Sequence, residues 1–215
     1  VIDVVEAMQP DAPLLNEEQF TKGIDPAPDK PSNIAAQMKS ILGDADAGFE
    51  QADLIVEREF NTKAAHQGYI EPHSSIANYT DGGNAEVWTS TQGHFLIRAQ
   101  LAKVLEMDVS KIKVTPAELG GGFGGKNSIY LEPLAIIMSK KSGRPVKMTM
   151  NRDEVFRASG PTSGTNITIK IGVTKAGRIT AAKAILNYQS GCFPGSSLPL
   201  CTPTVFTRYD IANVL

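Results

Sequence analysis

The chain has 215 residues, of which 41% are hydrophobic and 20% charged, which suffices for one large or two small domains with an ordinary core. Its formal net charge of −2 argues against a nucleic-acid partner, since such partners usually require a basic face. No apolar run approaches the roughly 20 residues that span a bilayer, and Asp3 and Glu6 interrupt the start where a signal peptide would be apolar. The two cysteines, Cys192 and Cys201, are too few for a disulfide framework and lack the C-x-x-C spacing of zinc or iron–sulfur sites, so we expect a reducing, cytoplasmic setting.

The first 50 residues are expected to form a connector and an irregular lead-in segment. Residues 21–37 read TKGIDPAPDKPSNIAAQ, with three prolines and little periodic apolar character. The chain ends on the apolar-rich segment Tyr209–Leu215, whereas natural termini are more often polar and loosely held. We therefore expect both ends to continue in a longer polypeptide.

The next part of the chain is predicted to contain a strand, a hairpin and a helix. Asp53–Phe60 is rich in branched and aromatic residues and is typical of a strand. The β-prone runs Ser75–Tyr79 and Ala85–Thr89 flank Asp81-Gly82-Gly83, and this turn signal predicts a hairpin. Apolar residues then follow helical spacing, which predicts a helix from about His94 to Met107.

The rest of the chain is predicted to contain four more strands and one more helix. Alternating polar and apolar residues predict strands at Lys111–Thr115 and Val146–Met150. Apolar residues at helical spacing predict a second helix between them, around Leu134–Met138. Two further strands, Thr165–Ile171 and Ile179–Leu186, are joined by a short turn. The sum is an α+β fold with mixed β-sheets, each packed by one or two helices.

The most informative segment lies between the predicted strand and the second helix and reads LGGGFGGK, residues 119–126, with five glycines among its eight residues. Glycine allows positive φ and close approach of the backbone to a ligand, and exposed N–H groups at such a turn form an anion-binding concavity. Phe123 could anchor this loop in a core or present its own N–H beside an apolar wall.

Three interpretations of the loop compete: a tight structural turn, a nucleotide-phosphate loop, and a cofactor loop. The phosphate loop fits poorly, because G-x-x-x-x-G-K-[ST] requires Ser or Thr where Asn127 follows Lys126. Gly120, Gly122 and Gly125 formally meet G-x-G-x-x-G, but a glycine run meets many patterns by chance.

The segment GGGFGGK resembles the first cofactor loop of the molybdenum hydroxylases, the family of xanthine dehydrogenase and aldehyde oxidase. Four other landmarks resemble that family in the same order and with similar spacing, from Gln51 to the end of the chain. They are Glu71–Ala77 (EPHSSIA), Trp88–Gln92 (WTSTQ) with the helix Arg98–Leu105 after it, Gly143–Lys147 (GRPVK) and Arg152–Glu154 (RDE). The resemblance implies that residues 51–215 form the first part of a molybdenum-cofactor-binding region, and that the chain is a fragment of it.

The resemblance implies roles for individual residues. Gln92 would donate a hydrogen bond to an oxo ligand of the metal, and Gly121, Gly122, Phe123 and Gly124 would bind the metal ligands and the pterin, largely through backbone N–H groups. The ordinary alternative for Gln92 is a strand-end side chain satisfied by the backbone.

The substrate site departs from that of purine-using members. Asn127, the predicted substrate contact, stands where those members have glutamate, and the region Ser197–Thr204 lacks their arginine, with Leu200 at or near its position. Both departures favour an aldehyde or an N-heteroaromatic substrate over xanthine or hypoxanthine.

The remaining ionisable residues receive no catalytic or metal-binding role. His66, His73 and His94 have spacings that match no standard ligand motif, and Glu71 is an attractive base to which nothing assigns a role. The family's glutamate base belongs to a later part of the sequence.

The family oxidises its substrate with water as the oxygen source and passes electrons through iron–sulfur clusters and usually FAD. The resemblance therefore implies molybdopterin as cofactor in the full enzyme. The expected partners are the rest of the molybdenum-binding subunit, iron–sulfur and flavin domains or subunits, and a small-molecule substrate. The isolated chain is expected to be inactive. The alternatives are a phosphate- or nucleotide-binding module and a ligand-free structural fragment.

Overall fold

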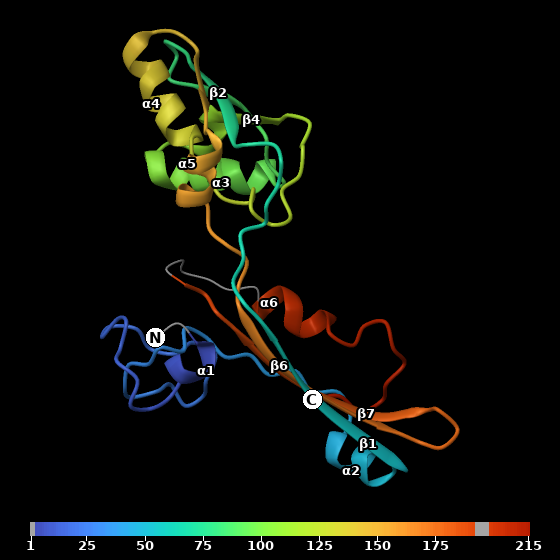
Figure 1. The fold of residues 1–215 in the computed structure, drawn as a ribbon. Coiled ribbons are helices and arrows are strands. Elements are labelled where there is room, and N and C mark those ends of the chain that lie inside the picture. Colours follow the sequence, from blue (N-terminus) through green and yellow to red (C-terminus); the bar gives the residue numbers. More distant parts are fainter. Residues whose placement is uncertain (1–2, 192–197) are drawn as a thin grey trace. The chain divides into compact units, whose positions relative to one another are not determined.

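The computed structural model describes residues 3–191 and 198–215 (Figure 1). The contacts divide the chain into two compact units. The first unit comprises Val1–Ala64 and Ser163–Leu215, and the second comprises Ala65–Thr162. None of the helices in the described ranges is both long and apolar enough to cross a bilayer.

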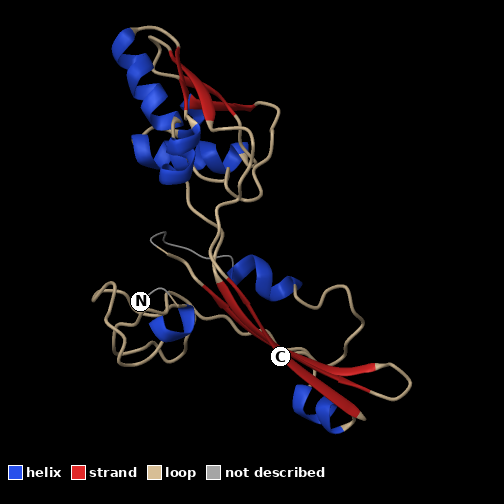
Figure 2. Ribbon diagram, in the orientation of Figure 1, coloured by secondary structure: helices blue, strands red, loops and turns tan. Residues whose placement is uncertain are grey.

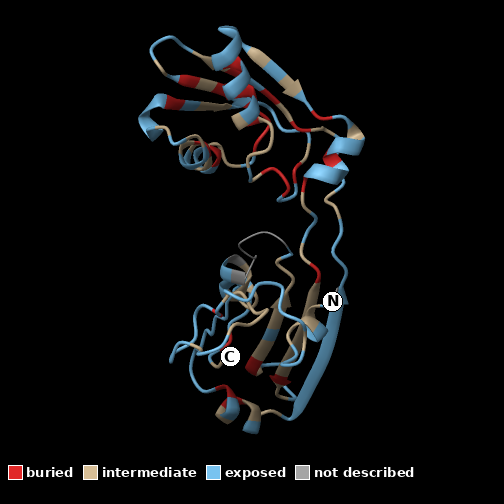
Figure 3. Ribbon diagram, turned by 90° about the vertical axis from the view of Figure 1, so that its left-hand side faces the viewer, coloured by how far each residue is buried: buried red, intermediate tan, exposed pale blue. Residues whose placement is uncertain are grey.

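The first unit is built on an antiparallel sheet with the strand order β1-β6-β7. Its strands are β1 (Leu54–Thr62), β6 (Thr165–Val173) and β7 (Ile179–Tyr188). The predicted strand near Asp53–Phe60 and the predicted pair of strands after residue 165 are thereby confirmed. All nine residues of β1 are exposed, as Figure 3 shows in pale blue.

The other elements of the first unit are short. They are α1 (Val4–Ala7), α2 (Ala45–Glu50), α6 (Leu198–Cys201) and the 3-10 helix η2 (Thr202–Thr204). Helix α2 packs on β7 and begins where the Asp44 carboxylate accepts a 3.0 Å hydrogen bond from Ala47 N. Between α1 and α2 the chain has no regular helix or strand, and the boundary expected at residue 51 stays a prediction.

The second unit contains a mixed sheet with the order β4-β3-β2-β5. Figure 2 draws its strands in red and its helices in blue. Strands β2 (Ser74–Tyr79) and β3 (Ala85–Thr89) form the predicted hairpin, with Ser75 opposite Thr89. Strand β4 (Ile112–Pro116) pairs parallel with β3, and β5 (Val146–Thr149) pairs antiparallel with β2. The α+β class is confirmed; the sheet of the second unit is mixed, whereas that of the first unit is antiparallel.

Two helices cover the sheet of the second unit and create its core. Helix α3 (His94–Leu105) contacts β4, and α4 (Glu132–Ser142) contacts β2, β3 and β5. The core combines alternate residues of the strands with one face of each helix. Its buried members are Ala77, Ala85, Val87, Ile97, Leu101, Ile112, Ala135 and Ile136. This core holds β3 through Ala85 and Val87 and β4 through Ile112, and these are the two strands after which Gln92 and the glycine loop follow.

The ends of these helices follow simple rules. Helix α3 stops at Leu105 rather than at the predicted Met107, because Glu106 adopts a left-handed φ of 51°. Gly143 ends α4 with a φ of 64°, a left-handed conformation that glycine adopts without strain.

Two helical segments of the second unit were not predicted. One is the 3-10 helix η1 (Val109–Lys111), and the other is α5 (Arg152–Ala158), which coincides with a landmark of the resemblance. Helix α5 begins with a capping box in which Asn151 and Glu154 each accept from the other's backbone N–H.

Candidate functional site

The Gln92 carboxamide lies just beyond the end of β3 and is bound to the glycine loop. Its Oε1 accepts hydrogen bonds from the N–H groups of Gly124, at 2.9 Å, and Lys126, at 3.2 Å. The Gln92 N–H donates to the Lys126 carbonyl at 3.1 Å. Gln92 and the glycine loop, roughly 30 residues apart in sequence, are therefore in direct contact, as a shared cofactor site requires.

The two N–H donors also orient the carboxamide. Only the carbonyl oxygen of an amide can accept from N–H groups, so the Nε2 group must point away from both. Nε2 makes no hydrogen bond to any residue that the structure describes. Gln92 therefore presents a free neutral donor, the group that its predicted role requires.

The loop Gly120–Gly125 is irregular and joins β4 to the segment before α4, as predicted. A Cβ on Gly122 would lie 2.5 Å from Gln92 Oε1, so any other residue at this position would displace the carboxamide. Gly121 and Gly124 have φ values of 96° and 88°, and Phe123 has a φ of 50°. The glycines thus serve both close contact and a backbone path that few other residues would follow.

The loop contains three consecutive unpartnered N–H groups. Those of Gly121, Gly122 and Phe123 have no hydrogen-bond acceptor among residues 3–191 and 198–215. In contrast, the N–H of Gly124 is already bound by Gln92. Successive free N–H groups at a turn form a partial positive charge that suits an anionic group.

Phe123 does not anchor the loop in a core. Its side chain is 70% exposed. The structure therefore agrees with the second role considered for Phe123, in which its backbone N–H is exposed beside its apolar ring.

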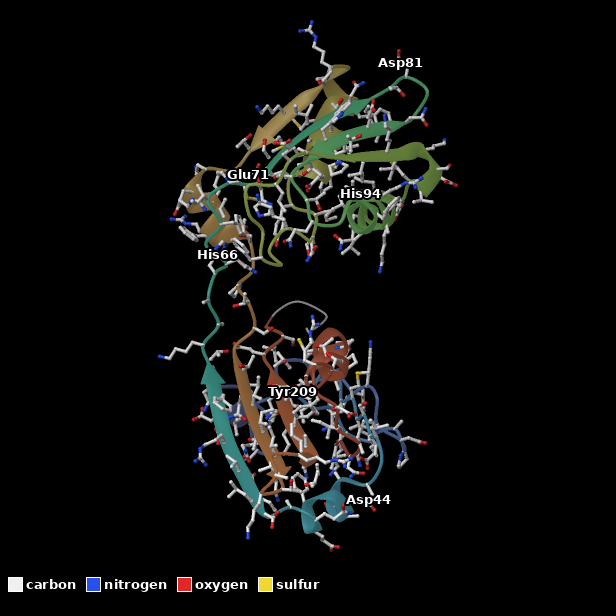
Figure 4. The ribbon with its side chains drawn as sticks, turned by 90° about the vertical axis from the view of Figure 1, so that its right-hand side faces the viewer. Asp44, His66, Glu71, Asp81, His94 and Tyr209 are labelled. Carbon is white, nitrogen blue, oxygen red and sulfur yellow. The ribbon has the colours of Figure 1, made fainter. Side chains whose placement is uncertain are left out.

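A buried ion pair lies beneath the loop. Lys126 is 1% exposed, and its Nζ lies 2.6 Å from Glu71 Oε2 and 4.9 Å from the centroid of the Tyr69 ring. The same Glu71 oxygen accepts a 2.9 Å hydrogen bond from Gly120 N. Figure 4 labels Glu71 among the side chains of the second unit. Sequence analysis gave Glu71 no role and treated Lys126 only as the end of a motif.

The Tyr69 hydroxyl belongs to a chain of hydrogen bonds whose directions follow from the available protons. Ser159 donates its only hydroxyl proton to the Val155 carbonyl. His66 Nδ1 accepts from Gly68 N, so His66 Nε2 carries the proton that it donates to Ser159 at 2.9 Å. Tyr69 then donates to Ser159 at 3.0 Å and accepts from His73 Nε2 at 2.6 Å.

His73 is held in its neutral form. Burial lowers the pKa of His73 to about 4, and the positive charge of Lys126 adds to the effect, whereas Glu71 opposes it. A neutral imidazole is consistent with a single proton on Nε2, directed at Tyr69.

The predicted substrate residue lies beside the loop. Asn127 is half-buried, with its Nδ2 3.5 Å from the Gly124 carbonyl oxygen. Its side-chain oxygen also lies near Gly93, at the start of α3. The side chain of Leu200 and residues 192–197 lie outside the described residues.

The three histidines do not come together. His66 and His73 both belong to the Tyr69 network, whereas His94 begins α3 and contacts the Phe95 ring at 4.2 Å between centroids. In the described ranges, no three His, Cys, Asp or Glu side chains are grouped so that they could hold a metal ion.

The donor set fits an anionic cofactor held by neutral groups. The three free N–H groups and Gln92 Nε2 all belong to segments in direct contact, and none of them carries a charge. A dithiolene and oxo group would meet hydrogen-bond donors here without a competing protein carboxylate on the loop.

Comparison with known proteins identifies the class. Residues 27–215 match the family model of the molybdopterin cofactor-binding domain, and the chain belongs to this family. It is 30% identical over 198 residues to the nicotinate dehydrogenase large molybdopterin subunit of Eubacterium barkeri, covering 92% of this chain and 45% of that relative. It is 32% identical over 223 residues to a probable hypoxanthine oxidase of Escherichia coli O157:H7, covering 92% and 23%.

The fold agrees with this assignment. The aldehyde oxidoreductase of Desulfovibrio gigas superimposes with a TM-score of 0.76 at 21% identity, covering 99% of this chain and 23% of that one. The family resemblance expected from sequence is confirmed. The chain spans less than half the length of these relatives.

Proposed function

We propose that this chain supplies one wall of the molybdopterin site in a molybdenum hydroxylase. The observation that carries the proposal is the contact between Gln92 and the glycine loop, which brings one free amide donor beside three free N–H groups. Gly121, Gly122 and Phe123 would bind the cofactor through these N–H groups, and Gln92 would bind it through Nε2. When bound, the cofactor supplies the redox centre.

Gly124 takes a different part in the site from the one its N–H would suggest. Because that N–H is bound to Gln92 Oε1, it orients the carboxamide, and any contact of Gly124 with the cofactor would be made by its Cα or carbonyl group. We retain Gly124 as a cofactor-site residue on this basis.

The rest of the enzyme would lie outside this chain. We propose that residues 51–215 form the first part of the molybdenum-binding region and that residues 1–50 form its lead-in. The chain lacks C-x-x-C motifs, so iron–sulfur clusters, and FAD where used, would lie on other domains or subunits.

A phosphate-binding module is the less favoured function. The free N–H groups could also donate hydrogen bonds to a phosphate, but phosphate loops use their lysine to neutralise the anion. The Lys126 side chain is fully buried and already paired with the Glu71 carboxylate, so it does not face a bound phosphate. Because Lys126 is used in this ion pair, the loop is better suited to a cofactor that is bound by neutral donors.

We propose that the substrate is an aldehyde or an N-heteroaromatic compound other than xanthine or hypoxanthine. Asn127 beside the loop can donate and accept hydrogen bonds but carries no charge. The likeness to a nicotinate dehydrogenase supports an N-heteroaromatic substrate, whereas the likeness to a probable hypoxanthine oxidase favours a purine. Only a direct comparison decides between them.

The test is a dye-reduction assay on the whole enzyme with aldehydes, nicotinate-like heteroaromatics, hypoxanthine and xanthine. Sites built on specific hydrogen bonds discriminate by on the order of 10⁴ in kcat/KM, so the purines should be much poorer substrates than the best aldehyde or heteroaromatic compound. Efficient purine turnover would refute the substrate class. Absence of molybdenum-dependent turnover on every class would refute the function itself.

A further inference from the structure

Glu71 joins the two ends of the glycine loop at Gly120 and Lys126, and we propose that its ion pair with Lys126 is a clamp that positions the loop and Gln92 for cofactor binding. The inference rests on the function proposed above. It assigns both residues as positioning residues, which act through the loop rather than by touching the substrate.

The first argument is geometric. A single oxygen, Glu71 Oε2, accepts from Gly120 N at 2.9 Å and from Lys126 Nζ at 2.6 Å. Gly120 is the first glycine of the loop, and Lys126 directly follows the last. The Glu71 N–H also donates to the Gly120 carbonyl at 3.3 Å. One side chain from the segment before β2 therefore joins both ends of the loop.

The second argument links the clamp to Gln92. The Lys126 backbone donates to Gln92 Oε1 and accepts from Gln92 N, while the Thr91 hydroxyl donates to the same Lys126 carbonyl at 3.0 Å. Lys126 thus holds Glu71 with its side chain and Gln92 with its backbone. Any displacement of Lys126 would shift the carboxamide whose Nε2 is the proposed cofactor donor.

The third argument is electrostatic. The Lys126 side chain is 0% exposed, whereas that of Glu71 is 32% exposed. A buried ammonium requires a counter-charge, and the Tyr69 ring below it supplies only a partial one. Removal of Glu71 strands a buried charge, but removal of the Lys126 ammonium leaves a carboxylate that water can reach. Substitution of Glu71 should therefore destabilise the protein more than substitution of Lys126.

These contacts also explain why Glu71 is not assigned as a base. Its Oε2 is occupied by two donors, one of them a permanent structural cation. A carboxylate oxygen that accepts hydrogen bonds from two fixed donors is suited to positioning the loop rather than to acting as a general base.

The experiment compares Lys126→Met, Glu71→Gln and the double variant in the whole enzyme, purified with and without the cofactor. Hydrogen–deuterium exchange is followed in the peptide 119–127, where the Gly124 and Lys126 amides are bound to Gln92. Molybdenum content and Tm are measured on the same samples. Exchange and metal content do not depend on turnover.

The matched control is the ion pair of Lys113 with Glu86. It has the same N–O distance of 2.6 Å in the same unit, but its side chains are 71% and 31% exposed. Lys113→Met should leave loop exchange, molybdenum content and Tm close to those of the unsubstituted enzyme, because exposed pairs contribute little.

The clamp predicts that Lys126→Met raises exchange of the loop peptide about tenfold while peptides of β2 and β3 stay protected. Molybdenum content should fall in parallel. Glu71→Gln should lower Tm more than Lys126→Met does, and the double variant, which strands no charge, should be more stable than Glu71→Gln.

Unchanged loop exchange in folded Lys126→Met protein would overturn the proposal. So would an increase spread evenly over the second unit, because that marks general destabilisation rather than a local clamp. If Glu71→Gln fails to fold, Lys126→Met and the double variant still give the measurement. Hydrogen–deuterium exchange on the cofactor-free protein tests the clamp even if the enzyme binds no molybdenum. Failure of the proposed function is therefore distinguished from failure of the clamp.

Discussion

At the scale of single residues, the orientation of one carboxamide decides what the site can bind. Gln92 Oε1 is occupied by the N–H groups of Gly124 and Lys126, which leaves Nε2 as the free group. A glutamate in this place would still accept both N–H groups but could donate nothing when ionised. The loop therefore determines that Gln92 acts as a donor.

This arrangement gives a prediction for Gln92 in the whole enzyme. Gln92→Ala removes the donor and the anchor of the loop, whereas Gln92→Glu keeps the anchor but replaces the donor by a negatively charged oxygen. Loss of one donor at a reacting centre typically costs about 10²–10³ in kcat, so both variants should lose turnover to that degree. Gln92→Glu should retain nearly the original Tm. Unchanged turnover at full molybdenum loading would rule out the role assigned to Gln92.

His73 gives a prediction about pH and stability. The pKa of His73 is lowered from 6.5 to about 4 in the folded protein, chiefly by burial. Between these values the unfolded chain binds a proton that the folded chain does not. The stabilisation is therefore fully present above about pH 6.5 and is lost as the pH falls toward 4, by roughly 2–3 kcal/mol at pH 4.5.

Trp88 provides the measurement, because it is the only tryptophan of the chain and lies in β3 of the second unit, which also contains His73. Urea unfolding of the 215-residue chain is followed by its fluorescence at pH 7.5 and 4.5. His73→Gln serves as the control and should lose less stability over this range than the original chain. An equal loss of unfolding free energy in both proteins would show that His73 does not contribute to the pH dependence of stability.

At the scale of elements, local sequence patterns predicted most of the fold. The hairpin β2–β3 follows from the turn signal Asp81-Gly82-Gly83 between two β-prone runs, and α4 follows from apolar spacing with Gly143 at its end. Such features depend on residues a few positions apart. The order β4-β3-β2-β5 depends on pairing between distant strands and has no local signal.

The unpredicted short helices show a different limitation. Helix α5 has only seven residues, too few for a clear apolar period, but its capping box at Asn151 and Glu154 is a recognisable signal. Asp44 gives a similar but weaker signal for α2. Cap residues would therefore have located both helices where periodicity could not.

The candidate site was predictable only in part. The family resemblance pointed to Gln92 and the glycine loop, and the structure brings them into contact. The pairing of Glu71 with Lys126 spans 55 positions and buries a lysine completely, which is rare for this residue type. No composition or spacing rule predicts such a contact, because it depends on how the loop folds over Tyr69.

At the scale of the whole molecule, the candidate site belongs to one continuous segment. Gln92, the glycine loop, Glu71 and Asn127 all lie in the second unit, Ala65–Thr162. This unit has its own sheet and core, so the clamp and the loop depend on contacts that the segment makes internally. In the proposed site these donors would form one wall, and other parts of the enzyme would supply the other walls, the base and the electron-transfer centres.

The isolated chain, which would contact the cofactor from one side only, should not retain it. A cofactor held on one side stays largely in water, and the cost of immobilising it then exceeds the gain from a few hydrogen bonds. General-base assistance, typically about 10²–10⁴ in rate, would also be missing. We therefore expect the 215-residue chain alone to fold at least in part, to bind no molybdenum and to catalyse no oxidation.

The most direct test of the central claim is the molybdenum and pterin content of the whole enzyme, measured beside the isolated 215-residue chain from the same expression host. The account predicts one molybdenum and one pterin per molybdenum-binding subunit in the whole enzyme, and neither in the isolated chain. A whole enzyme without molybdenum or pterin, under conditions in which a related hydroxylase is fully loaded, would contradict the claim that this chain forms part of a molybdopterin site.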